Sequence, residues 1–178
     1  ILEWFTKNPQ RSQTALAINS NLGYGKDKLD KLIAASGDVK LDLYTSCEAL
    51  TDRAEYIRDG LDYYQWRDNV KYLLDSGRFN GIHVMCTINA LCIGDLWNLL
   101  SQVMTWRLEY GKDAIAFTLN ILRFPSFQSP LVLDIQHKEQ AIANLNTFVE
   151  VYGGGTLHEH EINHIRRLPE YFVSVRKP

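Results

Sequence analysis

The sequence contains few cysteines and no long apolar run, and both shortages exclude classes of protein. Its three cysteines, Cys47, Cys86 and Cys92, are an odd number without C-x-x-C spacing. Neither a disulfide framework nor a thiolate metal site is therefore indicated, and the composition fits a reducing compartment. No apolar stretch approaches the roughly 20 residues that span a bilayer, and no charged-then-apolar signal opens the chain. We expect a cytoplasmic protein without a membrane partner.

The chain also lacks an excess of positive charge. Lysine and arginine together number 19 against 21 aspartate and glutamate residues, which gives a net charge of -2. No basic block is longer than Arg166-Arg167, whereas a nucleic-acid partner requires a clustered basic face. We therefore expect no nucleic-acid partner. The length of 178 residues is enough for one folded unit with a real core.

Short apolar runs that each end in polar residues recur along the first two thirds of the chain. Most of the runs are followed by a helix-like stretch, which is typical of βαβ units and a parallel sheet. Because parallel strands present their ligands at their carboxyl ends, the polar residues mark the expected location of a site. These polar segments are Asn19-Ser20-Asn21, Thr45-Ser46-Cys47-Glu48, Thr87-Ile88-Asn89, and Asn120 with Arg123.

The hydrophobic pattern predicts an α/β fold with four strand-helix units and no internal repeat. Helical spacing of apolar residues and closing glycines place the helices between the strands. A last helix is expected to end before Pro169, because proline interrupts helices. We expect strands at 15–18, 39–45, 82–88 and 114–121, and helices at 26–36, 64–74, from 95, at 138–151 and at 157–168. We divide the chain into a main region, 1–152, and a C-terminal helical extension, 153–178.

The segment from Val39 to Gly77 carries the most distinctive phrase of the sequence. A strand ends in TSCEA, AEYIRDGLDYYQW follows, and the next helix contains Asn69. This arrangement resembles the middle of radical S-adenosylmethionine (radical SAM) enzymes, in particular those with a twitch domain. The phrases ALAINSNL, GIHVMCTINAL and LNILRFPSF resemble the flanking units of the same family, so the resemblance covers residues 15–151.

The resemblance implies a fold and a chemistry. The fold would be a partial (β/α) TIM-like barrel of parallel strands in which four βα units are represented. The complete enzyme would use a 4Fe-4S cluster and an external electron donor to cleave S-adenosylmethionine. The resulting 5'-deoxyadenosyl radical would abstract hydrogen from a small-molecule or peptide substrate, so that the cofactor carries the reaction and the protein positions it.

Two motifs of the family are missing from this sequence. Neither the C-x-x-x-C-x-x-C loop that holds the cluster nor a G-G-E-P word is present. The cysteines that are present do not replace the loop, because a cluster needs thiolates that converge from suitable positions. Both motifs belong upstream of the first strand in the family. We therefore expect a fragment that is inactive alone, with its cluster ligands located before Ile1.

The resemblance also implies roles for the polar residues at the strand ends. Ser46 and Glu48 would bind the ribose hydroxyls, because a hydroxyl and a carboxylate donate and accept in complementary ways. Arg58 would bind the methionine carboxylate through its planar fork. Asn19 and Asn89 would hold the adenosine or the substrate, and the backbone at Asn120 would meet adenine. The candidate cofactor-binding residues are thus Asn19, Ser46, Glu48, Arg58, Asn89 and Asn120.

The same residues also fit a purely structural role, and we keep this as an alternative hypothesis. Polar residues at strand ends often serve only as turn formers or helix caps, and Arg58 would then pair with Glu55 or Asp62 on a solvated surface. A non-catalytic α/β scaffold that binds a partner is the corresponding hypothesis.

A zinc-dependent hydrolase is the remaining alternative. His160-Glu161-Ile162-Asn163-His164 has the H-E-x-x-H pattern, in which two histidines one helical turn apart bind zinc and the glutamate activates a water. A catalytic zinc site needs a third protein ligand, and only Glu170 follows as a carboxylate. The segment also fits the wet face of an ordinary amphipathic helix.

Overall fold

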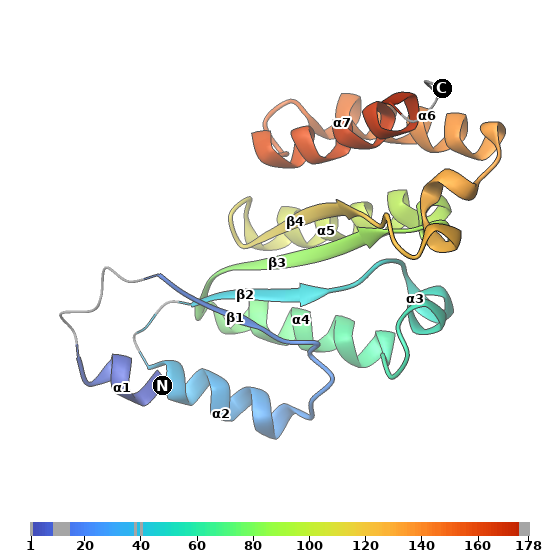
Figure 1. The fold of residues 1–178 in the computed structure, drawn as a ribbon. Coiled ribbons are helices and arrows are strands. Elements are labelled where there is room, and N and C mark those ends of the chain that lie inside the picture. Colours follow the sequence, from blue (N-terminus) through green and yellow to red (C-terminus); the bar gives the residue numbers. More distant parts are fainter. Residues whose placement is uncertain (1, 9–14, 38, 40, 175–178) are drawn as a thin grey trace.

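A computed structural model describes residues 2–8, 15–37, 39 and 41–174 of the chain. Its four strands form one parallel sheet in the sequential order β1-β2-β3-β4 (Figure 1). The α/β class expected from the sequence is therefore confirmed. The strands are β1 (Leu16–Asn19), β2 (Leu41–Ser46), β3 (Phe79–Ile88) and β4 (Ile115–Ile121).

Helices connect successive strands and follow the last one. Each connection contains at least one helix, as parallel neighbours require. The helices are α1 (Leu2–Thr6), α2 (Lys26–Ser36), α3 (Thr51–Ile57), α4 (Tyr63–Ser76), α5 (Leu96–Tyr110), α6 (Ile135–Tyr152) and α7 (Glu159–Ser174). In Figure 1, α6 and α7 lie beyond β4, on the side away from β1. Within the described ranges, no helix is both long and apolar enough to cross a membrane.

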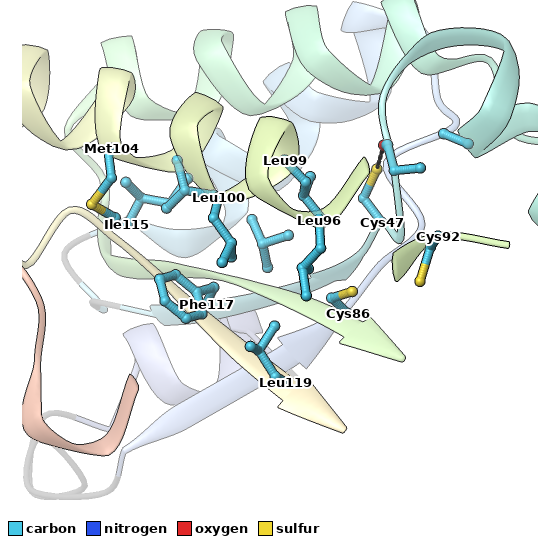
Figure 2. Packing of buried hydrophobic residues seen from close by; sticks show 14 of the residues in the cluster. Cys47, Cys86, Cys92, Leu96, Leu99, Leu100, Met104, Ile115, Phe117 and Leu119 are labelled. Carbon is cyan, nitrogen blue, oxygen red and sulfur yellow. Dashed lines mark hydrogen bonds between the residues drawn. The ribbon is translucent and has the colours of Figure 1, made fainter. Parts of the chain in front are cut away.

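One face of the sheet is packed against helices. Side chains on this face, such as Leu43, Val84 and Phe117, are fully or almost fully buried. Trp66 of α4 donates from Nε1 to Oγ1 of Thr45 at 2.9 Å, which fixes α4 on this face. Figure 2 shows leucines of α5 packed against apolar residues of β3 and β4 in the same way.

The opposite face, which we call the open face, is largely polar, and most of its side chains remain at least partly exposed. Successive side chains of a strand point to opposite faces, so every second residue of each strand belongs here. Parallel sheets are usually covered on both faces and built from apolar runs. Packing against a second layer of helices would favour apolar side chains here, so it does not explain why this face is polar. Its partly or fully exposed side chains are Ala17, Asn19, Asp42, Tyr44, Ser46, His83, Met85, Thr87, Thr118 and Asn120.

Local signals set most element boundaries. The carboxylate of Asp62 accepts a hydrogen bond from the amide of Gln65 at 2.9 Å and caps the start of α4. Gly77 ends the same helix with φ +60°, a left-handed conformation that favours glycine. Asp134 caps α6 in the same manner by accepting from the His137 amide. This cap explains why α6 starts before residue 138, where periodicity alone placed its beginning.

The expected end of the last helix before Pro169 is wrong, because α7 continues through this residue to Ser174. Proline has no amide hydrogen and leaves the carbonyl four residues earlier without its helical partner. Leu168 and Phe172 on either side of Pro169 are buried in the core. Burial of these side chains offsets the lost hydrogen bond, so tertiary packing overrides the local rule.

The outer edge of β4 is bonded by side chains instead of by another strand. Arg107 of α5 donates from Nε and Nη2 to the carbonyl of Ile115 at 3.0 and 2.7 Å. Its guanidinium also pairs with Glu161 of α7, with 2.6 Å between Nη2 and Oε1. The same carboxylate accepts from the amide of Phe117 at 2.9 Å. This buried pair therefore satisfies two outward backbone groups of the strand.

A third side chain bonds the next outward backbone group along β4. His164 of α7 accepts at Nδ1 from the amide of Leu119 at 3.2 Å. Residues 115, 117 and 119 alternate with those that bond to β3, so all three bonds lie on the outer edge. Helix α7 therefore takes the place that a fifth strand would occupy along this part of β4.

Candidate functional site

A pocket lies at the carboxyl ends of β1 and β2. Its volume of about 240 Å³ is below the roughly 300–1,000 Å³ of sites that enclose a whole small ligand. It is therefore suited to one end of a larger molecule. Three of the predicted site residues, Asn19, Ser46 and Arg58, are brought together here. The lining residues are Asn19, Ser20, Asn21, Tyr44, Ser46, Arg58 and Met85.

The fourth predicted residue of this region, Glu48, is engaged by Arg58. Its carboxylate accepts from Nη2 at 2.6 Å and from Nε at 3.1 Å, which is the two-bonded geometry of a strong arginine-carboxylate pair. The Glu48 side chain is 4% exposed, whereas that of Arg58 is 36% exposed. The hydrogen bond to Glu48 raises the pKa of Arg58. Glu48 thus holds the guanidinium at the pocket and does not itself line the pocket.

The alternative partners of Arg58 are occupied elsewhere. Glu55 accepts from the amide of Tyr63 at 2.9 Å, and Asp62 caps α4. The expectation of a surface pair between Arg58 and either carboxylate is therefore wrong. Its partner lies ten residues earlier, at the end of β2, where sequence spacing gave no signal for the pair.

Hydrogen bonds from neighbouring elements fix the two loops that form the pocket. Asn69 of α4 is buried and donates from Nδ2 to the carbonyls of Leu22 and Tyr24, both at 2.8 Å. The loop after β1 is thereby attached to α4. Asp95 at the start of α5 accepts from the amide of Leu50 at 2.7 Å, which attaches the loop after β2. The pocket is consequently built from segments that two helices hold in place.

The remaining two predicted residues lie outside this pocket. Asn89 is 7% exposed, and its Oδ1 accepts from the amides of Leu91 and Cys92 at 2.9 and 3.0 Å. It therefore shapes the turn before α5, as the turn-former reading predicts. Asn120 is exposed on the open face of β4, in register with Thr87. The six candidates thus separate into one cluster of four and two isolated residues.

Sequence reasoning missed a group on the open face. The ring of His83 stacks on Tyr44 with 4.5 Å between centroids and 13° between planes. Its Nε2 lies 3.6 Å from Oδ1 of Asp42. Tyr44 also lines the pocket, so this group extends the candidate site from the strand ends onto the sheet. Polar residues at alternate positions of β2 were the available signal, whereas nothing in the sequence marked His83.

The three cysteines are buried beneath the carboxyl ends of the strands (Figure 2). Burial raises the pKa of Cys47 to about 12. A hydrogen bond with Cys92, together with burial, raises the pKa of Cys86. Protonated thiols are neither nucleophiles nor metal ligands. In the part of the chain that the structure describes, no group of three or more His, Cys, Asp or Glu side chains is arranged to hold a metal ion. These residues therefore do not fit a 4Fe-4S cluster.

The H-E-x-x-H segment lies on α7, away from the pocket. Burial opposes ionisation of Glu161, but hydrogen bonds from Arg107 and from the His158 and Phe117 amides outweigh it and lower the pKa. A glutamate that activates water must reach a solvent-facing metal, whereas Glu161 is 0% exposed and ion-paired. This segment closes the sheet edge in the structure, and its geometry offers the zinc hypothesis no support.

Comparisons with models of protein families, with curated proteins and with solved structures each find no match to this chain. The resemblance to radical SAM enzymes therefore rests on the sequence phrases alone.

Proposed function

We propose that the chain forms part of a radical SAM (β/α) barrel, with S-adenosylmethionine bound at the pocket and the substrate held over the open face. The sequential strand order supports the barrel. Crossover connections between parallel strands have one hand, so a sheet that never reverses its order carries its helices on one face. Doubly wound sheets reverse their order and carry helices on both faces.

The observation that carries this proposal is the polar face of a parallel sheet that ends in a polar pocket. Hydroxyl, amide, imidazole and thioether groups occupy the open face from β1 to β4. In a barrel this face would be the interior, and ligands would enter at the carboxyl ends of the strands. The pocket lies at that end, so the face and the pocket together form one continuous candidate site.

The pocket residues fit the polar groups of S-adenosylmethionine. Arg58 presents a half-buried guanidinium, and its charge is balanced by Glu48. The local net charge of this pair is close to zero. The pair therefore suits a ligand with a zwitterionic end, such as an amino acid, better than it suits a ligand that carries only negative charge. Ser46 and Asn19 supply a hydroxyl and an amide for the ribose hydroxyls. In the family, the bound ligand supplies a 5'-deoxyadenosyl radical for hydrogen abstraction.

Glu48 has a different role from the one implied by the family resemblance. Glu48 is 4% exposed and does not line the pocket, so in this proposal it orients the guanidinium and does not bind ribose. An arginine held in this way loses less side-chain entropy when a carboxylate binds. The pair would therefore increase both affinity and geometric selectivity for the amino acid end.

Calorimetric titration of the chain with S-adenosylmethionine tests the proposal. Ser46→Ala and Asn19→Ala remove pocket groups at exposed or half-exposed positions, so the fold should persist. We expect each variant to bind several-fold more weakly than the unmodified chain. Asn163→Ala is the matched control, because this asparagine is exposed on α7, outside both the pocket and the open face. Absence of binding at millimolar ligand, or equal loss in the control, would overturn the proposal and favour a non-catalytic scaffold.

A further inference from the structure

The contact between α7 and β4 contains one hydrogen bond that depends on the protonation state of a histidine. His164 accepts at Nδ1 from the amide of Leu119, and a neutral imidazole offers one acceptor nitrogen. A protonated imidazole has a hydrogen on both nitrogens. The ring would then direct an N–H group at the N–H group of Leu119, and the bond could not form.

The surroundings of His164 favour the neutral form. Its pKa is lowered by burial and by the neighbouring Arg167 and His160, while Glu161 acts in the opposite direction. All three of these groups lie on α7, and β4 contributes the Leu119 amide. The cations of the adjacent segments are engaged with aromatic rings further along the helix, namely Arg123 over Tyr171 and Lys138 over Phe172.

The neighbouring bonds of the same edge behave differently on acidification. Glu161 stays ionised in mild acid because its pKa is lowered, and Arg107 remains its partner. The bonds to Ile115 and Phe117 are therefore retained when the imidazole takes up a proton. Only the step nearest the carboxyl end of β4 is sensitive to mild acid.

We infer that α7 carries a pH-sensitive latch, formed by His164 and the Leu119 amide, that closes the outer edge of β4 near the carboxyl end of the sheet. At neutral pH the latch is closed and the edge is covered. Protonation of His164 opens it while the Arg107-Glu161 pair keeps the remainder of α7 attached. An opened strand edge exposes backbone groups that accept an extended segment. This inference is independent of S-adenosylmethionine binding.

Amide hydrogen exchange followed by NMR tests the latch directly. Protection factors, which correct for the intrinsic pH dependence of exchange, are measured at pH 7.5 and 5.5 with a chelator present to exclude bound metal. We expect protection of Leu119 to fall at least tenfold at the lower pH while that of Phe117 is unchanged. Val84 in the central part of the sheet reports global stability. Equal protection of Leu119 at both pH values would overturn the inference.

Two further measurements connect the effect to the imidazole. His164→Asn keeps an acceptor near the position of Nδ1 but does not titrate, so protection of Leu119 should become independent of pH. In the unmodified chain, the His164 ring protons should titrate with the same midpoint as the loss of Leu119 protection. A midpoint that differs clearly, or an undiminished pH effect in His164→Asn, would show that another group is responsible.

Discussion

The two edges of the sheet are treated in opposite ways. At β4, side chains of α5 and α7 bond the outward backbone groups of Ile115, Phe117 and Leu119. At β1, the outward groups belong to Ala17 and Asn19, and no described residue bonds to them. One edge of this sheet is therefore closed to a further strand, whereas no part of the chain that the structure describes closes the other.

This difference bears on the proposed barrel. The expected barrel is partial, so one of its edges stays without a strand partner and has to be covered in another way, since an uncovered edge is a template for association. Because α7 occupies the β4 edge, further strands of a barrel would add beside β1. The pocket lies at the β1 and β2 end, so such strands would also form its remaining wall.

Removing the arginine of the closed edge should have the largest effect. Arg107→Ala leaves the Glu161 carboxylate buried without its cation and the Ile115 carbonyl without its donor. Breaking a buried pair in this way costs about 3–5 kcal/mol. Urea unfolding should show the loss, and Arg67→Ala, which removes an exposed pair with Asp68, should change stability by less than about 0.5 kcal/mol. Equal effects of the two substitutions would contradict a structural role for the edge pair.

Loosening the loop that follows β1, at the other edge of the sheet, should have a smaller effect. Asn69→Ala leaves the carbonyls of Leu22 and Tyr24 without the amide that joins them to α4, at a cost of about 1–3 kcal/mol. We also expect the loop beside β1 to become more sensitive to protease. Asn163→Ala, at an exposed position of α7, provides the control for unfolding and proteolysis. A loop that stays protected in Asn69→Ala would mean that other contacts hold it.

Acid should weaken the closed edge in two stages. Glu161 has a pKa below its unfolded value of 4.5, so its contribution is present above that value and is lost as pH falls below it. His164 has a pKa below 6.5, so stability declines modestly as pH falls below 6.5. Urea unfolding between pH 7.5 and 3.5 should show the larger decline below 4.5, and Glu161→Gln should reduce that decline. A single decline centred above pH 6 would contradict this order.

A charged side chain placed on β1, the edge strand without a described partner on its outer side, should affect self-association of the chain more than its free energy of unfolding. We expect the chain to self-associate at high concentration through β1, because no residue in the described ranges bonds to its outward groups. Ala17→Lys should reduce association, since lysine on an edge strand opposes pairing. Asn120→Lys, at the other end of the open face, should leave association unchanged. Sedimentation velocity measures both, and a chain that stays monomeric at every concentration would show that the β1 edge is protected.

Sequence reasoning succeeded where local signals decide the structure. Apolar runs marked the four strands, and Gly77 ended α4 as its position required. The grouping of Asn19 with Ser46 followed from one rule, because parallel strands place their carboxyl ends together, whereas Arg58 was a candidate through the family resemblance. These features depend on neighbouring residues or on topology, both of which periodicity reveals.

The failures share a physical cause, which is contact between residues far apart in the chain. The pairing of Arg107 with Glu161 joins residues 54 positions apart. Because of this pairing, the glutamate of the H-E-x-x-H pattern bonds the edge of the sheet and does not belong to a metal site. Burial of Phe172 carried α7 through Pro169 against local preference. No pattern in a single sequence shows which distant carboxylate a buried arginine will meet.

The most direct test of the account is residue-level NMR mapping of S-adenosylmethionine on the chain. We predict chemical-shift changes at the Asn19 and Ser46 amides and at Nε of Arg58, with none at the Phe117 amide on the closed edge. This result would place the ligand at the carboxyl ends of β1 and β2. Changes confined to α7, or no changes at saturating ligand, would contradict the proposed site.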